Sequence, residues 1–214
     1  MAQWPLAARS FVDAFTTIAP VMNPIGCALL FPQLSAGITR AERSDLARRI
    51  AINAALALLI AMWAGTTLLS VFGIGIGALR IAGGLVIVAQ AWLLLGETQV
   101  DALALGSSSP NASSAAAFVP LTIPFTTGPG TFAAAMALGT ARPALSADLL
   151  PYFLGLSAAA IALAVLVALL YGSADRAIAW LGREKSQALA RLSAFLLLCV
   201  GIQILVLGLH EVWS

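Results

Sequence analysis

The chain has 214 residues, of which 61% are hydrophobic and only 9% are charged. Soluble domains carry about 25% charged residues, so this composition excludes a fold that needs a polar surface in water. The formal net charge of +2 is too small to indicate nucleic-acid binding. Strands of alternating polarity, as in a membrane β-barrel, are not found in the sequence. The composition therefore predicts an all-α membrane protein.

Long stretches without charged residues mark the expected membrane-spanning helices. A span needs roughly 20 apolar residues, and five charge-free stretches are long enough, with a shorter sixth between Arg80 and Glu97. The sequence predicts six transmembrane helices, at residues 9–32, 47–72, 77–95, 116–139, 149–172 and 190–210.

Basic residues predict the orientation of these helices. They are expected in the short connections, where they form one cluster around the first connection and another around the fifth. The clusters comprise Arg40, Arg43, Arg48 and Arg49, and Arg176, Arg183, Lys185 and Arg191. Because basic residues favour the cytoplasmic side, six helices place both termini on the extracytoplasmic side of the cell inner membrane.

A segment rich in Gly, Ser and Ala divides the chain near its middle. This flexible linker, residues 97–115, separates a first three-helix unit, residues 1–96, from a second, residues 116–214. Since each unit has three spans, the second enters the membrane from the opposite side. The sequence thus predicts two inverted-topology repeats, an arrangement that is frequent in secondary transporters.

Helix-breaking residues occur at matching positions of the first and fourth predicted helices. These helices contain IAPVMNPIG and TIPFTTGPG, and aligning Pro20 with Pro124 also aligns Gly26 with Gly130. Proline lacks an N–H and clashes with the preceding turn. Pro20 with Pro24, and Pro124 with Pro129, are therefore each expected to unwind about one turn of their helix. Freed backbone groups are tolerated in a membrane only where protein or a polar cavity satisfies them. Two such breaks predict a shared binding site, whereas a kink that serves packing alone would explain either motif by itself.

The motifs also supply side-chain hydrogen-bonding groups and the N-termini of half-helices, which favour an anionic group such as a carboxylate. Small residues around the breaks suit a compact zwitterion. The predicted substrate-binding residues are Asn23, Pro24, Ile25, Gly26, Thr126, Thr127, Gly128, Pro129, Gly130 and Gln203.

Three motifs in this order resemble one known family. NPIG in the first helix, FGIGIGALRIAGG across the second connection and PFTTGPG in the fourth helix are similar to motifs of the MarC family of bacterial and archaeal inner-membrane proteins. The resemblance extends over residues 11–208. It implies six transmembrane helices and, for some members, transport of small neutral amino acids such as glycine and alanine.

Carried over by position, the resemblance matches residues 23–26 to the first family signature and residues 128–130 to the second. It also matches Gln203 to a glutamine of the sixth helix. The chain departs from the family at Ser193, where glycine is frequent, and Asp13 matches no family motif.

Two charged residues have alternative interpretations. Asp13 is interpreted as a solvated charge near a helix end, with a proton acceptor as the alternative. Arg80 is interpreted as reaching the membrane interface, with contact to a substrate carboxylate as the alternative.

The leading hypothesis is a secondary transporter that moves small neutral amino acids by alternating access at a midplane site. Its partners are the small-molecule substrate and membrane lipid, a homo-oligomer is a candidate assembly, and a proton or sodium ion is a candidate coupling ion. The alternatives are a non-transport scaffold or assembly protein and an exporter of other small solutes. An enzyme is not expected, because the predicted spans lack a nucleophile with a base or a metal cluster, and neither a cofactor nor a metal is predicted.

Overall fold

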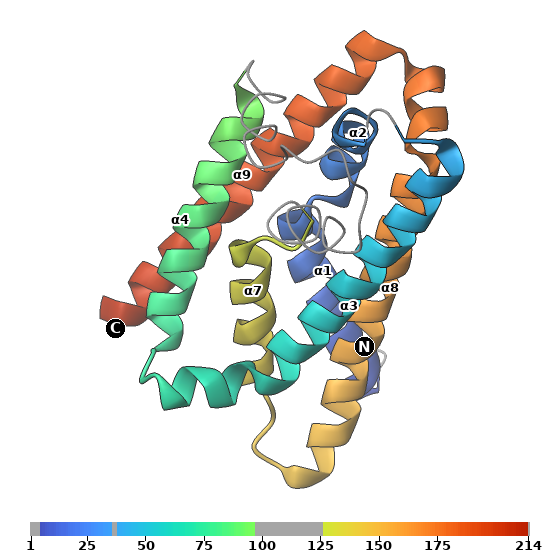
Figure 1. Cartoon of the computed structure of the whole chain (residues 1–214). Helices are drawn as coiled ribbons and strands as arrows, with labels where there is room; N and C mark the ends of the chain where they lie inside the picture. Colours follow the sequence, from blue (N-terminus) through green and yellow to red (C-terminus); the bar gives the residue numbers. More distant parts are fainter. Residues whose placement is uncertain (1–4, 36–37, 97–125, 214) are drawn as a thin grey trace.

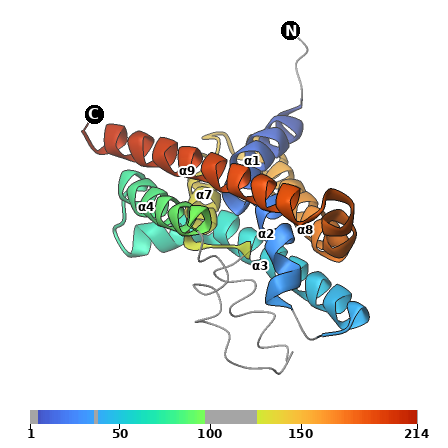
Figure 2. The ribbon, with the colours of Figure 1, turned by 90° about the horizontal axis from the view of Figure 1, so that it is seen from above.

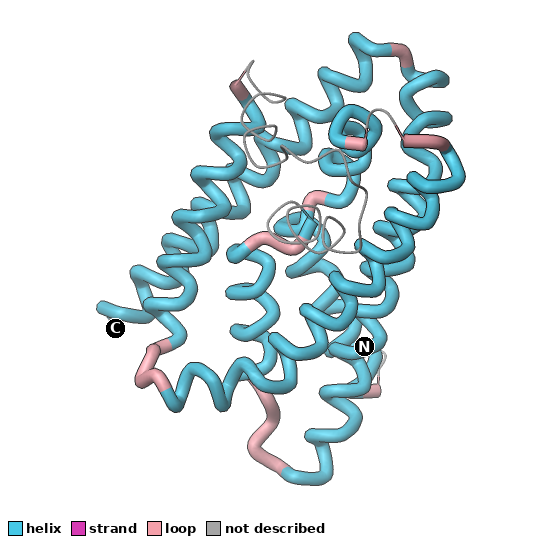
Figure 3. Tube along the Cα trace, viewed as in Figure 1, coloured by secondary structure: helices cyan, strands magenta, loops and turns pink. Residues whose placement is uncertain are grey.

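The computed structural model describes residues 5–35, 38–96 and 126–213, and every regular element in them is a helix (Figures 1 and 3). The helices are α1 Leu6–Met22, α2 Pro24–Leu34, α3 Arg40–Val71, α4 Ile76–Leu95, α7 Pro129–Thr140, α8 Ser146–Leu181 and α9 Arg183–Trp213. The prediction of an all-α protein is confirmed for these residues.

Five segments of the described chain are long and apolar enough to cross a membrane. They are α1 together with α2, and then α3, α4, α8 and α9. The expected fourth span, residues 116–139, is described only from residue 126 onward, where α7 occupies its second part. The predicted linker, residues 97–115, lies outside the described residues.

Large apolar side chains cover the outer faces of the long helices. Ile60 of α3, Trp92 of α4 and Leu169 of α8 are each more than half exposed. A soluble protein rarely exposes contiguous apolar patches of this kind. The outer surface therefore fits a lipid environment.

The long helices extend beyond the charge-free stretches. α3 begins at Arg40 and α8 continues to Leu181, so the basic residues expected in connections form the outer turns of helices instead. At the start of α3, the Thr39 hydroxyl accepts the Glu42 N–H and the Glu42 carboxylate accepts the Thr39 N–H. This capping box begins the helix before the apolar stretch, and arginine is itself a good helix former. The prediction that the basic residues lie in short connections is therefore wrong.

An ion pair joins three helix ends at the start of α3. Arg43 donates to both carboxylate oxygens of Asp175 near the end of α8, each at 2.7 Å. Its second terminal nitrogen donates to the Ser35 carbonyl, directly after α2, at 3.1 Å. Arg43 is largely buried, with 15% of its side chain exposed. The end of α2 is thus held against α3 and α8.

α4 and α9 run antiparallel along a seam of glycines (Figures 1 and 2). A Cβ atom on Gly84 would lie 2.8 Å from the backbone nitrogen of Leu205, and a Cβ atom on Gly208 would lie 2.8 Å from that of Ile81. Small residues let membrane helices approach closely enough for backbone contact. The two helices therefore form one rigid pair.

The short helices α2 and α7 lie among the longer ones (Figure 2). α2 packs against α8 and α9, whereas α7 packs against α3 and α4. On α7, a Cβ atom at Gly139 would meet the backbone of Met62 in α3, and Ala133 lies 2.5 Å from the position of a Cβ on Gly83 in α4. Each short helix is thus enclosed by two long helices.

Alanine at Gly84 is expected to destabilise the protein by about 1–3 kcal/mol, because the added methyl group meets backbone atoms that have no rotamer to change. The matched control is Gly172→Ala in α8, where a Cβ would meet nothing within 4 Å. That control should gain about 0.5–1 kcal/mol from helix propensity. Thermal unfolding of the purified protein in detergent measures both, and equal midpoints would contradict the close α4–α9 seam.

Candidate functional site

The first helix break consists of one residue. Asn23 adopts the left-handed conformation (φ 47°, ψ 54°) between α1 and α2, and Pro24 is the first residue of α2. The prediction that the prolines unwind about one turn is wrong here, because Pro20 remains inside α1. The Asn23 N–H still donates to the Ala19 carbonyl at 3.1 Å, and the Cys27 N–H donates to the Asn23 carbonyl at 3.0 Å. Further unwinding would lose these bonds inside the membrane.

The Asn23 side chain caps α2 and leaves its amino group unpartnered. Its Oδ1 atom accepts the Gly26 N–H at 3.2 Å, as an N-cap residue does. This bond assigns the orientation of the amide, because the reverse orientation would place two donors together. The residue is only 7% exposed, and within the described part of the chain its Nδ2 atom has no hydrogen-bond partner. A buried donor therefore remains available next to the break.

The second break ends at the start of α7. Gly128 precedes this helix, Pro129 is its first residue, and the Gly128 carbonyl accepts the Phe132 N–H at 3.1 Å. Thr127 is fully buried, and its Oγ1 atom has no partner among the residues that the structure describes. The predicted break at Pro124 lies outside the described residues. The described part of this break thus contains a buried unpartnered hydroxyl.

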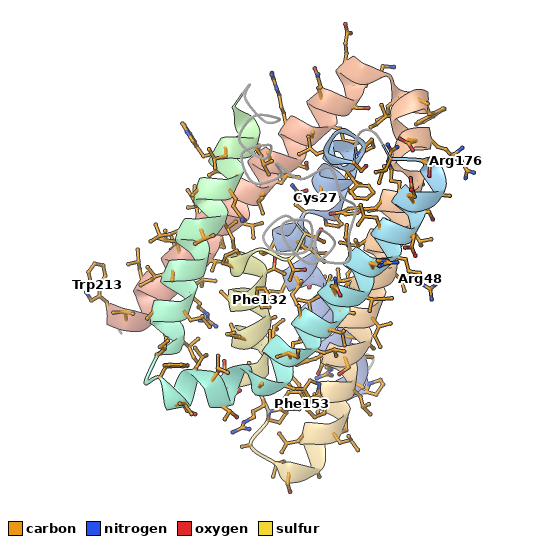
Figure 4. The ribbon with its side chains drawn as sticks, in the orientation of Figure 1. Cys27, Arg48, Phe132, Phe153, Arg176 and Trp213 are labelled. Carbon is orange, nitrogen blue, oxygen red and sulfur yellow. The ribbon has the colours of Figure 1, made fainter. Side chains whose placement is uncertain are left out.

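Tyr171 of α8 contacts both breaks. Its hydroxyl lies 2.9 Å from Thr126 Oγ1, and its side chain also hydrogen-bonds to the Cys27 thiol in the first turn of α2. The segment leading into α7 lies beside the junction of α1 and α2 (Figures 1 and 2). Figure 4 shows Cys27 and Phe132 between the α4–α9 pair and the α3–α8 pair. We call Asn23, Gly26, Thr126 and Thr127 the paired-break site.

Glycine and serine line the contact between α2 and α9. A Cβ atom on Gly26 would lie 2.5 Å from Asn23 Nδ2 and 2.6 Å from Ser193 Oγ. Gly26 therefore has no room for a side chain while Asn23 and Ser193 hold these positions. Ser193, the departure from the family pattern, lies next to the unpartnered amino group and donates its own hydroxyl proton to the Ala190 carbonyl at 2.8 Å.

Other predicted site residues lie further from this centre. Ile25 is 49% exposed, and Pro129 is also exposed, although its neighbour Gly130 is buried against Ile87 of α4. Gln203 is exposed on α9. It lies on the helix face opposite the glycines that contact α4, since residues two apart on a helix point in different directions. The structure does not bring Gln203 to the paired-break site.

Neither Tyr171 nor Cys27 was identified from the sequence as part of the site. A signal for Tyr171 was present, because it is one of only two tyrosines and lies within a charge-free stretch. Tyrosines of membrane proteins usually lie at the interface, and a buried tyrosine hydroxyl needs a partner. Its partners come from distant parts of the chain, so their identity required the structure.

The charged residues of the spans lie away from the paired-break site. Arg80 at the start of α4 donates to Glu211 near the end of α9 at 2.6 Å, with about a third of each side chain exposed. Asp13 is exposed on α1. Among the described residues, no group of three or more His, Cys, Asp or Glu side chains is placed to hold a metal ion.

Comparisons with known proteins give one consistent match. The profile of the MarC family integral membrane proteins matches residues 8–213. The UPF0056 inner membrane protein MarC of Escherichia coli O1:K1 / APEC is 29% identical over 204 residues, covering 91% of each chain. The protein of the same description from Salmonella typhimurium (strain LT2) is 29% identical over 209 residues, again covering 91% of each chain. No solved structure matches the chain significantly.

The Asn23→Ala variant is expected to be less stable than the Asn23→Gly variant by about 1 kcal/mol. Glycine adopts the left-handed conformation without a Cβ clash, and alanine does not. Both substitutions remove the cap on the Gly26 N–H, so their difference isolates the backbone effect. Thermal unfolding in detergent measures it. A glycine variant no more stable than the alanine variant would show that the left-handed conformation at Asn23 is not present in solution.

Proposed function

The chain belongs to the MarC family of integral membrane proteins, and we propose that it is a secondary transporter of small neutral amino acids. The paired-break site holds the solute in this proposal. Glycine-like and alanine-like solutes cross the inner membrane by alternating access to that site, driven by a proton or sodium gradient. Residues of the helix breaks bind the solute, and the long helices enclose it.

The observation that carries this proposal is the pair of unpartnered polar atoms, Asn23 Nδ2 and Thr127 Oγ1. Leaving a buried donor or acceptor unsatisfied costs about 1–3 kcal/mol. The alignment of Pro20 with Pro124 also pairs Asn23 with Thr127, and each residue lies within two residues of the proline that begins its short helix. A solute that hydrogen-bonds to both would supply the missing partners.

The packing of the helices supports the inverted-repeat part of the proposal. α2 packs against α8 and α9 of the second half, and α7 packs against α3 and α4 of the first half. Both short helices begin with proline directly after the break. α4 and α9, the third long helices of the two halves, pair with each other. An inverted repeat with broken helices at its midplane would produce this pattern.

The chemistry of the paired-break site favours a compact and electrically neutral solute. Among the described residues, the two breaks contain no charged residue and the largely buried Arg43 is paired with Asp175, so no unpaired charge there balances a net charge on a solute. The Asn23 amino group can donate to a carboxylate. The Thr127 hydroxyl accepts a hydrogen bond from an ammonium group. Together these groups match a zwitterionic amino acid.

Charge at the helix ends supports an orientation. The basic residues at the start of α3 and around the junction of α8 and α9 mark the cytoplasmic end. Both termini are then extracytoplasmic, and a sixth span includes α7. Two other functions are the alternatives to amino-acid transport: a membrane scaffold or assembly protein, and an exporter of other small solutes.

Valine at Thr127 is expected to abolish most uptake of labelled glycine or alanine into proteoliposomes while leaving the protein as stable or more stable. The reason is that valine keeps the shape of threonine and removes a hydroxyl that has no protein partner. Asn23→Gly should also impair uptake. Thr16→Val is the control, because its exposed hydroxyl donates to the Val12 carbonyl on α1 at 2.7 Å, away from both breaks.

The uptake measurements use imposed proton and sodium gradients in turn. Transport by the wild-type protein that is lost in Thr127→Val and kept in Thr16→Val supports the site. Full uptake by Thr127→Val would refute it. No movement of glycine or alanine by the wild-type protein under either gradient would refute amino-acid transport and leave the two alternatives, a scaffold and an exporter of other small solutes.

A further inference from the structure

We propose that Tyr171 is a positioning residue that couples the two helix breaks, holding Asn23 and Thr127 in register for one solute. This inference rests on the proposed function of the paired-break site and adds a residue from outside both breaks. Tyr171 itself does not touch the solute. It acts through Thr126, a member of the paired-break site that directly precedes Thr127, and through Cys27, which directly follows Gly26.

Tyr171 is held firmly in the interior. It is 1% exposed, and its ring stacks on Phe31 of α2 with the centroids 4.6 Å apart and an interplanar angle of 27°. The stacking sets the ring against α2, so the hydroxyl has little freedom. It reaches Thr126 Oγ1 at 2.9 Å and the Cys27 thiol. One hydroxyl thus joins an element of the first half to an element of the second.

The contacts of Tyr171 end next to the unpartnered atoms. Thr126 directly precedes Thr127, and the Cys27 thiol donates to the carbonyl of Met22, which directly precedes Asn23, at 3.8 Å. The network therefore runs from one break to the other, Met22–Cys27–Tyr171–Thr126. Hydroxyl and thiol groups both donate and accept, so these bonds can rearrange when a solute binds. A shift at either break is transmitted to the other.

A second tyrosine shows what a purely structural hydroxyl does in the same helix. Tyr152 of α8 donates to the Leu138 carbonyl in α7 at 2.7 Å, and it is 9% exposed. That bond joins α8 to the far part of α7 and contacts neither break. Tyr152→Phe is therefore a matched control for Tyr171→Phe, since both substitutions keep the ring and remove one largely buried hydroxyl.

The first test is the kinetics of alanine uptake into proteoliposomes. Tyr171→Phe should raise KM about tenfold with little change in Vmax, and a tenfold change corresponds to about 1.4 kcal/mol. Thr126→Val should also raise KM, and the double variant should be no worse than Tyr171→Phe alone, because Tyr171→Phe already lacks the bond that Thr126→Val removes. Thr126→Ser keeps the hydroxyl that Thr126→Val removes, so its KM should be close to that of the wild-type protein. Tyr152→Phe should leave KM unchanged.

The second test needs no transport. In a Cys199→Ser background, which removes the exposed thiol, a membrane-permeant methanethiosulfonate reagent reports on buried Cys27. Thr126→Val should speed its modification severalfold although residue 126 belongs to the other break, and Tyr152→Phe should not. Free alanine, added as the solute, should slow the modification of Cys27 in the Cys199→Ser protein.

The outcomes separate the two proposals. If Tyr171→Phe and Thr126→Val match Tyr152→Phe in both KM and labelling rate while Thr127→Val loses uptake, the coupling by Tyr171 is refuted and the site stands. If the wild-type protein moves no solute, the proposed function is refuted. In that case the labelling rate of Cys27 in Thr126→Val still decides whether the two breaks are coupled. Where transport is measured, additive effects of Tyr171→Phe and Thr126→Val on KM would also refute the coupling.

Discussion

The structure depends on one constraint, which is that backbone hydrogen bonds inside a membrane must be made by the protein itself. A helix interrupted at midspan has to recover the bonds that the interruption removes. At Asn23 the recovery is nearly complete, because the backbone on both sides keeps its bonds and the side chain takes the Gly26 N–H. The left-handed conformation redirects the chain within one residue. An interior helix N-terminus results at little cost in hydrogen bonds.

That N-terminus determines how the surrounding helices pack. α2 and α7 are too short to span a membrane alone, so each is enclosed by two long helices. Close enclosure requires small residues where helices cross, and glycines provide it at Gly65 and Gly139 between α3 and α7 and at Gly84 and Gly201 between α4 and α9. The two breaks contain no charged residue among the described residues, and the largely buried Arg43 is paired with Asp175. Polarity at the breaks therefore comes from backbone, amide, hydroxyl and thiol groups.

The parts of this arrangement that follow from hydropathy could be predicted from the sequence. Charge-free stretches locate the long helices, since a bilayer demands apolar length, and Pro24 and Pro129 locate the breaks to within a few residues. The size of the first break could not be predicted, because a proline such as Pro20 is compatible with a membrane helix when its neighbours satisfy the freed carbonyl. The ends of the helices could not be predicted from hydropathy either, because caps such as Thr39 let a helix begin among charged residues, before the apolar stretch.

The composition of the candidate site was only partly readable for a related reason. Asn23 and Thr127 lie in local motifs, so the sequence identifies them without knowledge of the fold. Gln203 also lies in such a motif, but the face of α9 that it occupies depends on which side packs against α4. Tyr171 and Ser193 reach the breaks from α8 and α9, and contacts between residues so distant in sequence are set only by tertiary packing.

The contrast between neighbouring residues at the breaks is the strongest argument that they serve a ligand. Thr126 and Thr127 are adjacent and equally buried, yet the structure gives a protein partner to the first, and the second has none among the described residues. Packing alone would favour valine at residue 127, which has the same shape and no polar atom to satisfy. A threonine there lowers the stability of the empty protein. In the function proposed above, the same hydroxyl would regain that free energy by binding the solute, so that a local cost in stability contributes to affinity.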